Sequence, residues 1–389
     1  MVKPAELPAA IERMLRSGLN APELNVDAVR SPGPAGAFAA SPRGQKHGGD
    51  ENDIEGVLAL DVTVRDTPAA AQRVIPLVLK TRHRAGFGET TLPTWLEAAG
   101  VRLDRPLEEH PTLVEFLVSG RREIDAYRRF SAQEETRGLL PEFLGAHVDE
   151  GADEYLLLVE RVENAMLMDS VDDVSRWHPP MTDRFVDALA PLHAMGLGRA
   201  PDGVWPAGVA DSASVLADTG LFRALLDAGR RSLPRVVTTE LYPVASRLID
   251  TLPDWYPEKD GLPKTLVHDD CNPRNACFRA DRSPVLYDWE LALWDTPQRD
   301  LAELLAFTLK PGFEVAALWE PVERHRRALS RAAGIELDAD SWREGFRIQI
   351  RYELINRLAW QWLFAASTTG LAYVPRVTAV TAEIIRRVS

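Results

Sequence analysis

The stretch from Thr265 to Leu301 constrains the fold of this 389-residue chain more than any other part of it. It opens with a short apolar run, Leu266 and Val267, which is typical of a buried strand. A polar turn follows. Two further apolar runs, 276–278 and 284–287, are separated by turn residues, as in a β-hairpin. The stretch therefore predicts short strands that end at polar loops.

Three oxygen-bearing side chains lie on these loops: Asp270, Asn275 and Asp288. Hard divalent ions such as Mg²⁺ prefer oxygen ligands, and one or two carboxylates usually hold them together with substrate phosphates. A further carboxylate beside such an ion orients an attacking hydroxyl and accepts its proton. The alternative interpretation is a polar turn with scattered acids, which a chain of this composition also contains.

The pattern H-x-D-x-x-x-x-N, followed closely by D-[FW], resembles the catalytic and metal-binding loops of the aminoglycoside phosphotransferase and choline kinase family, which has a protein-kinase-like fold. The resemblance implies that Asp270 is the catalytic base and that Asn275 and Asp288 are magnesium ligands. It also implies that His268 fixes the loop and that Asp300 caps the backbone amides of the loop.

Asp269 departs from the family pattern, which usually has glycine at this position. Because two carboxylates are adjacent here, we expect the pKa of one of them to be raised. One interpretation is that Asp269 points away and caps a nearby backbone amide. The other is that Asp269 lines the acceptor site and binds a cationic or hydroxyl group of the substrate.

The composition is that of an ordinary globular protein, with 45% apolar and 26% charged residues and a formal net charge of −13. This charge argues against nucleic acid as the main partner. No run approaches 18 apolar residues, so no membrane partner is expected. The N-terminal residues predict a short amphipathic helix, and Cys271 and Cys277 are expected to be reduced. These features favour a cytoplasmic enzyme.

The N-terminal part predicts strands over 24–29, 56–64, 74–81, 143–148 and 155–160. Lys80 ends an otherwise apolar run, where an ammonium is costly unless it is paired. The resemblance implies that nucleotide phosphates and a helix glutamate are its partners. A helix predicted to begin at Pro111 carries Glu123 as the candidate glutamate and Glu115 as a weaker one.

Two other segments of this part relate to the nucleotide. Residues 31–50 are rich in glycine, proline and serine and predict a long loop, either a mobile surface loop or the loop that covers the phosphates. The resemblance places the hinge between the two lobes after residue 160. Backbone groups near Glu160 and Val162 would then bind the purine.

The rest of the chain has mainly helical patterns, over 182–195, 212–230, 237–252, 301–309, 313–332, 339–366 and 375–388. His193, on the first of these, is expected to be a packed core histidine. The resemblance places the acceptor site among the C-terminal helices. The candidates for binding the acceptor are Asp269, Arg274, Glu290, Tyr352 and Asn356.

Together these patterns predict an α+β, bilobal, protein-kinase-like fold with a small β-rich N-lobe over 1–160 and a larger, mainly helical C-lobe over 161–389. The expected function is Mg²⁺-dependent transfer of the γ-phosphate of ATP, or of GTP, to a hydroxyl of an aminoglycoside, amino alcohol, sugar or related metabolite. Two alternatives remain open: phosphorylation of Ser or Thr hydroxyls of a peptide in natural-product biosynthesis, and a nucleotide-binding pseudokinase.

Overall fold

A computed structural model of the chain describes residues 5–31, 56–83, 92–113, 119–168, 174–201, 205, 211–367 and 371–388. The chain divides into two compact units, each of which combines separate segments of the sequence. The first unit comprises Met1–Glu89, Val118–Asp169 and Ala276–Glu290, and the second comprises Thr90–Leu117, Ser170–Asn275 and Leu291–Ser389. These units do not follow the contiguous division at residue 160, which stays a prediction.

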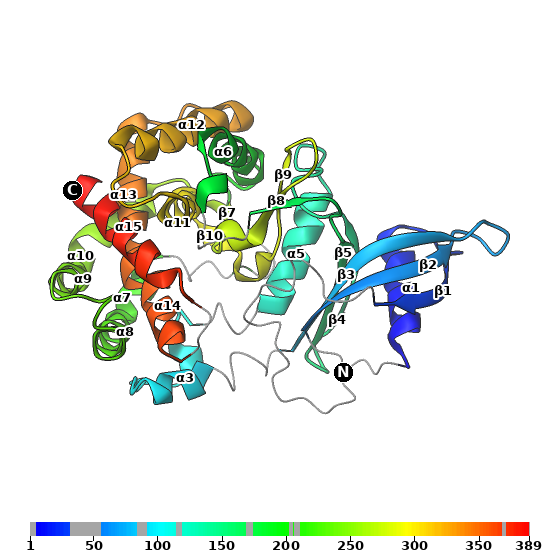
Figure 1. Ribbon diagram of the computed structural model, residues 1–389, viewed down its shortest axis with the longest axis horizontal. Coiled ribbons are helices and arrows are strands. Elements are labelled where there is room, and N and C mark those ends of the chain that lie inside the picture. Colours follow the sequence, from blue (N-terminus) through cyan, green and yellow to red (C-terminus); the bar gives the residue numbers. More distant parts are fainter. Residues whose placement is uncertain are drawn as a thin grey trace. The chain divides into compact units, whose positions relative to one another are not determined.

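The first unit contains a five-stranded antiparallel sheet with the strand order β1-β2-β3-β5-β4 (Figure 1). Its strands are β1 (Asn25–Arg30), β2 (Gly56–Arg65), β3 (Arg73–His83), β4 (Phe143–Asp149) and β5 (Glu154–Glu160). Helices α1 (Leu7–Gly18) and α5 (Ser119–Ser131) complete this part. All five strands lie where the alternating apolar pattern predicts them.

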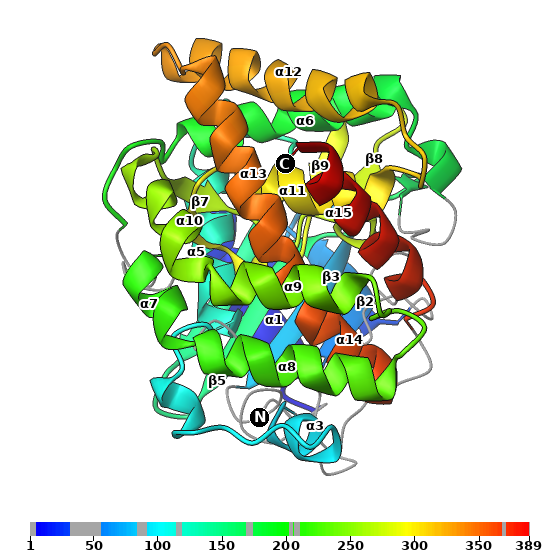
Figure 2. The ribbon, with the colours of Figure 1, turned by 90° about the vertical axis from the view of Figure 1, so that its left-hand side faces the viewer.

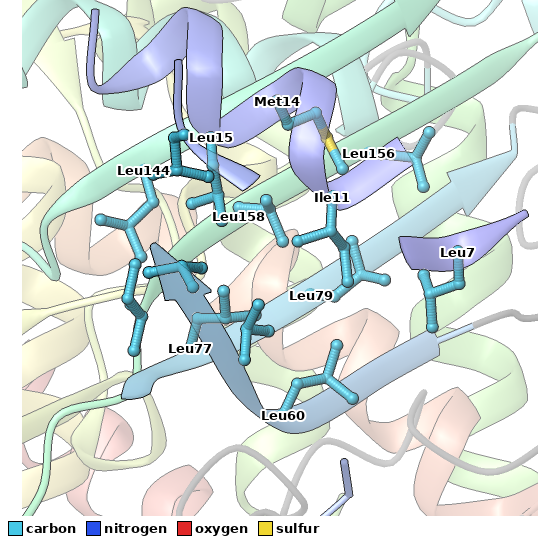
Figure 3. Close-up of a cluster of buried hydrophobic side chains, with 14 residues drawn as sticks. Leu7, Ile11, Met14, Leu15, Leu60, Leu77, Leu79, Leu144, Leu156 and Leu158 are labelled. Carbon is cyan, nitrogen blue, oxygen red and sulfur yellow. The ribbon is translucent and has the colours of Figure 1, made fainter. Parts of the chain in front are cut away.

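The two faces of β3 have different functions in the unit, because successive side chains of a strand point to opposite faces. Leu77 and Leu79 are buried in a cluster with Ile11 and Leu15 of α1 (Figure 3). Lys80 points to the opposite face, where it pairs with a glutamate of α5. The apolar cluster therefore anchors the strand that presents the lysine.

A smaller sheet in the same unit consists of β6 (Met166–Leu167), β8 (Ala276–Phe278) and β9 (Pro284–Leu286), in the order β6-β8-β9. Strands β8 and β9 are antiparallel, and the Arg279 amide donates to the Ser283 carbonyl across the turn at 2.9 Å. The hairpin predicted from the two apolar runs is confirmed. Both strands are buried throughout, and Cys277, Val285 and Tyr287 form an apolar cluster within the hairpin.

The second unit is mainly helical (Figure 2). Its described α-helices are α3 (Leu92–Ala98), α6 (Pro179–Ala194), α7 (Ser212–Ala217), α8 (Thr219–Ser232), α9 (Leu241–Asp250), α10 (Leu252–Trp255), α11 (Gln298–Thr308), α12 (Val315–Ala333), α13 (Ala339–Ile355), α14 (Arg357–Ser367) and α15 (Val374–Val388). Helices α6 and α12 lie side by side (Figure 2). The only extended pair in the described part of this unit is β7 (Thr265–Val267) with β10 (Leu293–Asp295).

The structure corrects three helix predictions. The pattern over 212–230 forms two helices, α7 and α8, with Asp218 between them. The predicted helix over 339–366 is in fact two helices, because the chain breaks at Asn356, whose φ is −110° and ψ −79°. The helix predicted to begin at Pro111 is described only from Ser119, and residues 111–113 form turns. The break at Asn356 affects the candidate site, because Arg357 follows it directly.

Two sequence predictions lie outside the described residues: the loop 31–50 apart from Ser31, and the alternative glutamate Glu115. Among the residues that are described, no helix combines the length and the hydrophobicity that a membrane span requires. The architecture agrees with the predicted fold class, an antiparallel sheet in the N-terminal part and a mainly helical C-terminal part.

Candidate active site

The loop that carries Asp270 begins where β7 ends, and the buried carboxylate of Asp300 fixes the first two backbone amides of the loop. Asp300 accepts hydrogen bonds from the amide of His268 and the amide of Asp269, each at 2.9 Å. Asp300 lies in the first turn of α11, and this helix belongs to the second unit, as does the loop. This is the position that the resemblance implies for Asp300, and it explains how a polar loop keeps one conformation without regular secondary structure.

Asp300 has a further partner in the interior of the unit. His193 Nε2 lies 3.0 Å from Asp300 Oδ2, and His193 Nδ1 lies 3.0 Å from His325 Nε2. Burial by itself would raise the pKa of Asp300, but the hydrogen bonds from His193 and the loop outweigh it and hold that pKa below its usual value. The expectation that His193 is a core histidine is confirmed, since the residue is buried.

Polar side chains hold both oxygens of the Asp270 carboxylate. Oδ1 accepts from Arg357 Nη2 at 2.8 Å and from Asn272 Nδ2 at 2.9 Å, and Oδ2 accepts from Asn275 Nδ2 at 2.6 Å. The side chain of Asp270 is 18% exposed, whereas that of Arg357 is 9% exposed. The carboxylate is therefore held in one orientation and is partly exposed.

Arg357 and Glu303 contact the Asp270 loop but were not among the site residues predicted from the sequence. Glu303 Oε2 accepts from the Cys271 amide at 2.7 Å, and Oε1 accepts from Asn272 Nδ2 at 3.2 Å and lies 3.8 Å from Arg357 Nη2. Burial raises the pKa of Glu303 well above its ordinary value, and nearby Asp270 adds to this effect. Glu303 lies three residues after Asp300 on α11, and residues at this spacing lie on the same face of a helix. The sequence could therefore have indicated that Glu303 is near the loop that Asp300 binds.

Asp269 is a buried member of an ion-pair network. Its Oδ1 accepts from Arg299 Nε, and Arg299 Nη1 also donates to Asp295 at 3.0 Å. The side chain of Asp269 is 2% exposed. The amide-capping interpretation is wrong, because the partner of the carboxylate is a guanidinium.

The backbone explains why glycine is usual at the position of Asp269. Its φ is +58°, in the left-handed region, where glycine is free of steric cost and aspartate is tolerated better than most residues. The pKa of Asp269 is raised, as expected for one of the two aspartates. The main cause is burial, and the repulsion comes from Asp300. The sequence therefore predicted the direction of the pKa shift and not its origin.

Lys80 lies between two carboxylates of the first unit. Its ammonium pairs with Glu123 Oε1 and with Asp288 Oδ1, the latter at 2.6 Å. The side chain of Lys80 is 5% exposed and that of Glu123 is 2% exposed. Burial raises the pKa of Glu123 to about 7, although the adjacent Lys80 opposes this rise. The pairing of Lys80 with Glu123 is observed, and the function of the pair in nucleotide binding stays a prediction.

The two predicted magnesium ligands belong to different units, Asn275 to the second and Asp288 to the first. Asn275 directs its Nδ2 to the Asp270 carbonyl at 2.8 Å and to the Asp270 carboxylate. Its amide oxygen makes no hydrogen bond to any described residue. Asp288 is 15% exposed and has a φ of +69°. An amide oxygen and a carboxylate fit Mg²⁺, which takes its remaining ligands from phosphates and water.

No cluster of three or more His, Cys, Asp or Glu residues suited to a metal occurs in the described part of the chain. A site of one amide and one carboxylate is not a cluster of that kind, so the magnesium assignment stays a prediction.

The structure narrows the predicted hinge contacts. The amide of Glu160 donates to the Glu142 carbonyl at 2.9 Å, and the amide of Arg161 donates to the Pro76 carbonyl at 3.1 Å. The carboxylate of Glu160 pairs with both terminal nitrogens of Arg279, at 2.6 and 2.7 Å. The amide of Val162 makes no hydrogen bond within the described residues. Among the described residues, the amide of Val162 is thus the one of these three without a partner, and its contact with a purine stays a prediction.

The remaining acceptor candidates differ in their surroundings. Glu290 is buried in the first unit and lies 3.1 Å from Arg82. Tyr352 is buried, its ring 4.9 Å from that of Tyr256 and beneath the Arg299 guanidinium. Asn356 is buried, with no hydrogen-bond partner for its Oδ1 among the described residues. Arg274 alone of these residues is partly exposed beside Asp270. Contact with the acceptor stays a prediction for all four.

Comparison with known proteins identifies the family. The model of the phosphotransferase enzyme family matches residues 109–330, more than half of the chain. The chain belongs to this family. The family match contains every residue of the Asp270 loop as well as Glu123, Asp288 and Asp300. No curated protein matches the sequence.

Several solved structures resemble this phosphotransferase family member. The choline kinase LicA from Streptococcus pneumoniae is 14% identical with a TM-score of 0.47, and the alignment covers 97% of this chain and 99% of that one. A glucosamine kinase is 17% identical with a TM-score of 0.43, with 90% and 94% covered. A thermostable mutant of the aminoglycoside phosphotransferase APH(4)-Ia is 14% identical with a TM-score of 0.43, with 97% and 98% covered.

Proposed function

We propose that this family member transfers the γ-phosphate of ATP to a hydroxyl of a small-molecule acceptor. The observation that carries the proposal is the Asp270 carboxylate, which is partly exposed and held by Arg357, Asn272 and Asn275. A carboxylate fixed in this way is suited to orient a hydroxyl and accept its proton. Family membership supports the class of reaction, and the proposal adds the nucleotide, the acceptor class and the residues.

In the proposed reaction, the acceptor hydroxyl donates a hydrogen bond to Asp270. The hydroxyl oxygen attacks the γ-phosphorus in line with the bond to the bridging oxygen of the β-phosphate. The new oxygen–phosphorus bond forms as the old one breaks, ADP leaves with the bonding electrons, and Asp270 takes the hydroxyl proton. Arg357 and Asn275 keep the carboxylate in the orientation that this transfer requires.

The nucleotide is proposed to bind through Lys80, which Glu123 orients, and through backbone groups near Val162. Asn275 and Asp288 would hold Mg²⁺, which when bound supplies positive charge to the phosphate oxygens. GTP remains the alternative nucleotide, since backbone contacts to a purine leave no side-chain signature.

The comparisons support neither alternative hypothesis, a peptide kinase or a pseudokinase. A pseudokinase is expected to lack a catalytic or metal-binding residue of the pattern. This chain retains the whole set: Lys80, Glu123, Asp270, Asn275 and Asp288. An active phosphotransferase is therefore the function that we propose.

A transfer assay with ATP labelled at the γ-phosphate tests this function. The protein is incubated with Mg²⁺ and a panel of hydroxyl compounds, next to the Asp270→Asn variant. We expect labelled product whose formation falls roughly 10²–10⁴-fold in the variant, the range for a positioned base. Asp254→Asn, the same substitution at an exposed position of α10, is the control and should retain activity. Equal transfer by Asp270→Asn would reject the assignment of the base.

A further inference from the structure

Arg274 is held in one orientation directly before the predicted metal ligand Asn275. It lies in a 3₁₀ turn, Pro273–Asn275, and both its amide and its Nε donate to Asn272 Oδ1, at 3.2 and 3.1 Å. Its guanidinium lies over the ring of Tyr373 at 5.1 Å and over that of Phe307 at 6.0 Å. One side-chain hydrogen bond, from Nε, and two aromatic faces therefore order a side chain that is otherwise flexible.

Within the described part of the protein, the terminal nitrogens of Arg274 form only a long ion pair, with Asp270. They make no hydrogen bond there, and Nη2 lies 4.0 Å from Asp270 Oδ1. The side chains of Arg274 and Asp270 are 19% and 18% exposed. A ligand that reaches the Asp270 carboxylate therefore also reaches the charged end of Arg274.

The charge of Arg274 is not needed to balance Asp270, because Arg357 already pairs with that carboxylate at 2.8 Å. Glu303, the other nearby acid, is 3% exposed and accepts from the Cys271 amide and the Asn272 side chain. The guanidinium groups of Arg357 and Arg274 thus both lie near the proposed base. The terminal nitrogens of Arg274 donate no hydrogen bond to the described residues. A planar guanidinium with open donors binds carboxylate or phosphate best, and it repels ammonium groups.

We infer that the acceptor carries an anionic group, a carboxylate or a phosphate ester, which binds Arg274 while its hydroxyl lies on Asp270. The inference rests on the proposed function and adds the substrate class. The short distance between Arg274 Nη2 and Asp270 Oδ1 requires that the hydroxyl and the anionic group lie close together in the acceptor. Short hydroxy acids and phosphorylated polyols meet this requirement, and polycationic acceptors do not.

The nucleotide is the other source of the same chemistry, since its γ-phosphate is also an anion near the base in the proposed reaction. The two sources differ in which kinetic constant depends on Arg274. Loss of an acceptor contact raises the KM of the anionic acceptor alone. Loss of a γ-phosphate contact changes the KM of ATP, or lowers kcat equally for every acceptor.

The experiment uses the full chain, ATP, Mg²⁺ and matched acceptors: D-glycerate with glycerol, D-gluconate with D-glucitol, and glycerol 3-phosphate, next to choline and glucosamine. We expect the anionic acceptors to have the higher kcat/KM. In Arg274→Gln their KM should rise roughly 10- to 100-fold, as for a lost hydrogen bond to a charged group, with the KM of ATP and the kinetics of the uncharged partners unchanged. Arg331→Gln, an exposed position near the end of α12, is the control.

Three results would overturn the inference: preference for choline or glucosamine, an Arg274→Gln effect shared by all acceptors, or an effect on the KM of ATP. If none of these compounds is phosphorylated, thermal shifts with the same anions and a non-hydrolysable ATP analogue decide the question. Stabilisation by an anion that is lost in Arg274→Gln supports the inference, and no difference between the proteins rejects it. Failure of the proposed function is separate, because it means no ATP-dependent transfer to any acceptor.

Discussion

Arg357 donates to the carboxylate of Asp270 at 2.8 Å, although the two residues lie 87 positions apart in the chain. The pair depends on the break between α13 and α14, since Arg357 is the first residue after Asn356. The guanidinium stabilises the ionised form of the proposed base and leaves the exposed side of the carboxylate open. It is a positioning residue, because it acts through Asp270.

Arg357→Met should lower kcat by roughly 10- to 100-fold, because Asp270 loses a charge-assisted hydrogen bond. Since the carboxylate loses an adjacent positive charge, the acidic limb of the kcat profile should also move to higher pH. Arg357→Lys should restore the position of that limb in part. The control is Arg351→Met, whose guanidinium is 21% exposed and lies 4.0 Å from Glu344. A lower kcat with an unmoved pH profile would show that Arg357 only stabilises the fold.

Removing Lys80 alone should destabilise the protein strongly, because the buried Glu123 and the partly exposed Asp288 would lose their shared cation. Lys80→Met is expected to cost about 3–5 kcal/mol of unfolding free energy. The double variant Lys80→Met, Glu123→Gln should be more stable than the sum of the two single effects predicts. Urea denaturation of the four proteins gives the coupling energy. Additive effects would mean that the pair is not formed in solution.

The metal prediction concerns Asp288 and Asn275. Chelation of Mg²⁺ should abolish phosphate transfer, and Asp288→Asn should come close to the same result, because one carboxylate ligand is lost. Asp281→Asn, in the exposed turn of the preceding hairpin, provides a matched control and should leave transfer unaffected. Full transfer in the presence of chelator would exclude the proposed metal site.

Asp269 is expected to matter for stability and not for the acceptor, because it is buried and paired with Arg299. Asp269→Gly and Asp269→Ala both remove the ion pair, but alanine at a φ of +58° is strained. The alanine variant should therefore be less stable by roughly 1–2 kcal/mol than the glycine variant. Both should keep the KM of the acceptor. A raised acceptor KM in Asp269→Gly, with unchanged stability, would restore the interpretation that Asp269 lines the acceptor site.

The raised pKa of Glu353 should make the free energy of unfolding depend on pH. Glu353 is buried, its Oε1 has no hydrogen-bond partner among the described residues, and burial raises its pKa to about 7, with Arg357 opposing that rise. A raised pKa in the folded state means that the contribution is present below the unfolded pKa of about 4.3 and is lost as pH rises toward 7. Glu353→Gln should therefore gain stability relative to the natural protein between pH 5 and 8, by up to roughly 3 kcal/mol.

Denaturation at both pH values measures this difference. Glu344→Gln, on the same helix with a side chain 36% exposed, is the control, and its stability relative to the natural protein should change little with pH. A constant difference between Glu353→Gln and the natural protein would contradict the prediction.

Local patterns were sufficient for the strands and for the hairpin. Strands β2, β3 and β5 consist of alternating or continuous apolar runs bounded by polar turns, and their positions follow from the side-chain period of a strand. The Asp270 loop was identifiable because Asp270, Asn275 and Asp288 occur at the spacing of the family pattern. The pair of Lys80 and Glu123 was expected from the family resemblance, because an ammonium in an apolar strand needs a partner but does not by itself indicate which acid supplies it.

Contacts between distant segments were not predictable from these patterns. The break at Asn356 has no proline or glycine to mark it, so the 339–366 segment was predicted as one helix and Arg357 had no special position. The sequence determined which chemical groups the Asp270 loop contains. Only the tertiary structure decided their charge environment, with Arg357 on Asp270, Arg299 on Asp269 and Arg274 partly exposed. The physical reason is that electrostatic interactions depend on distance and burial, which are set by how separate helices pack.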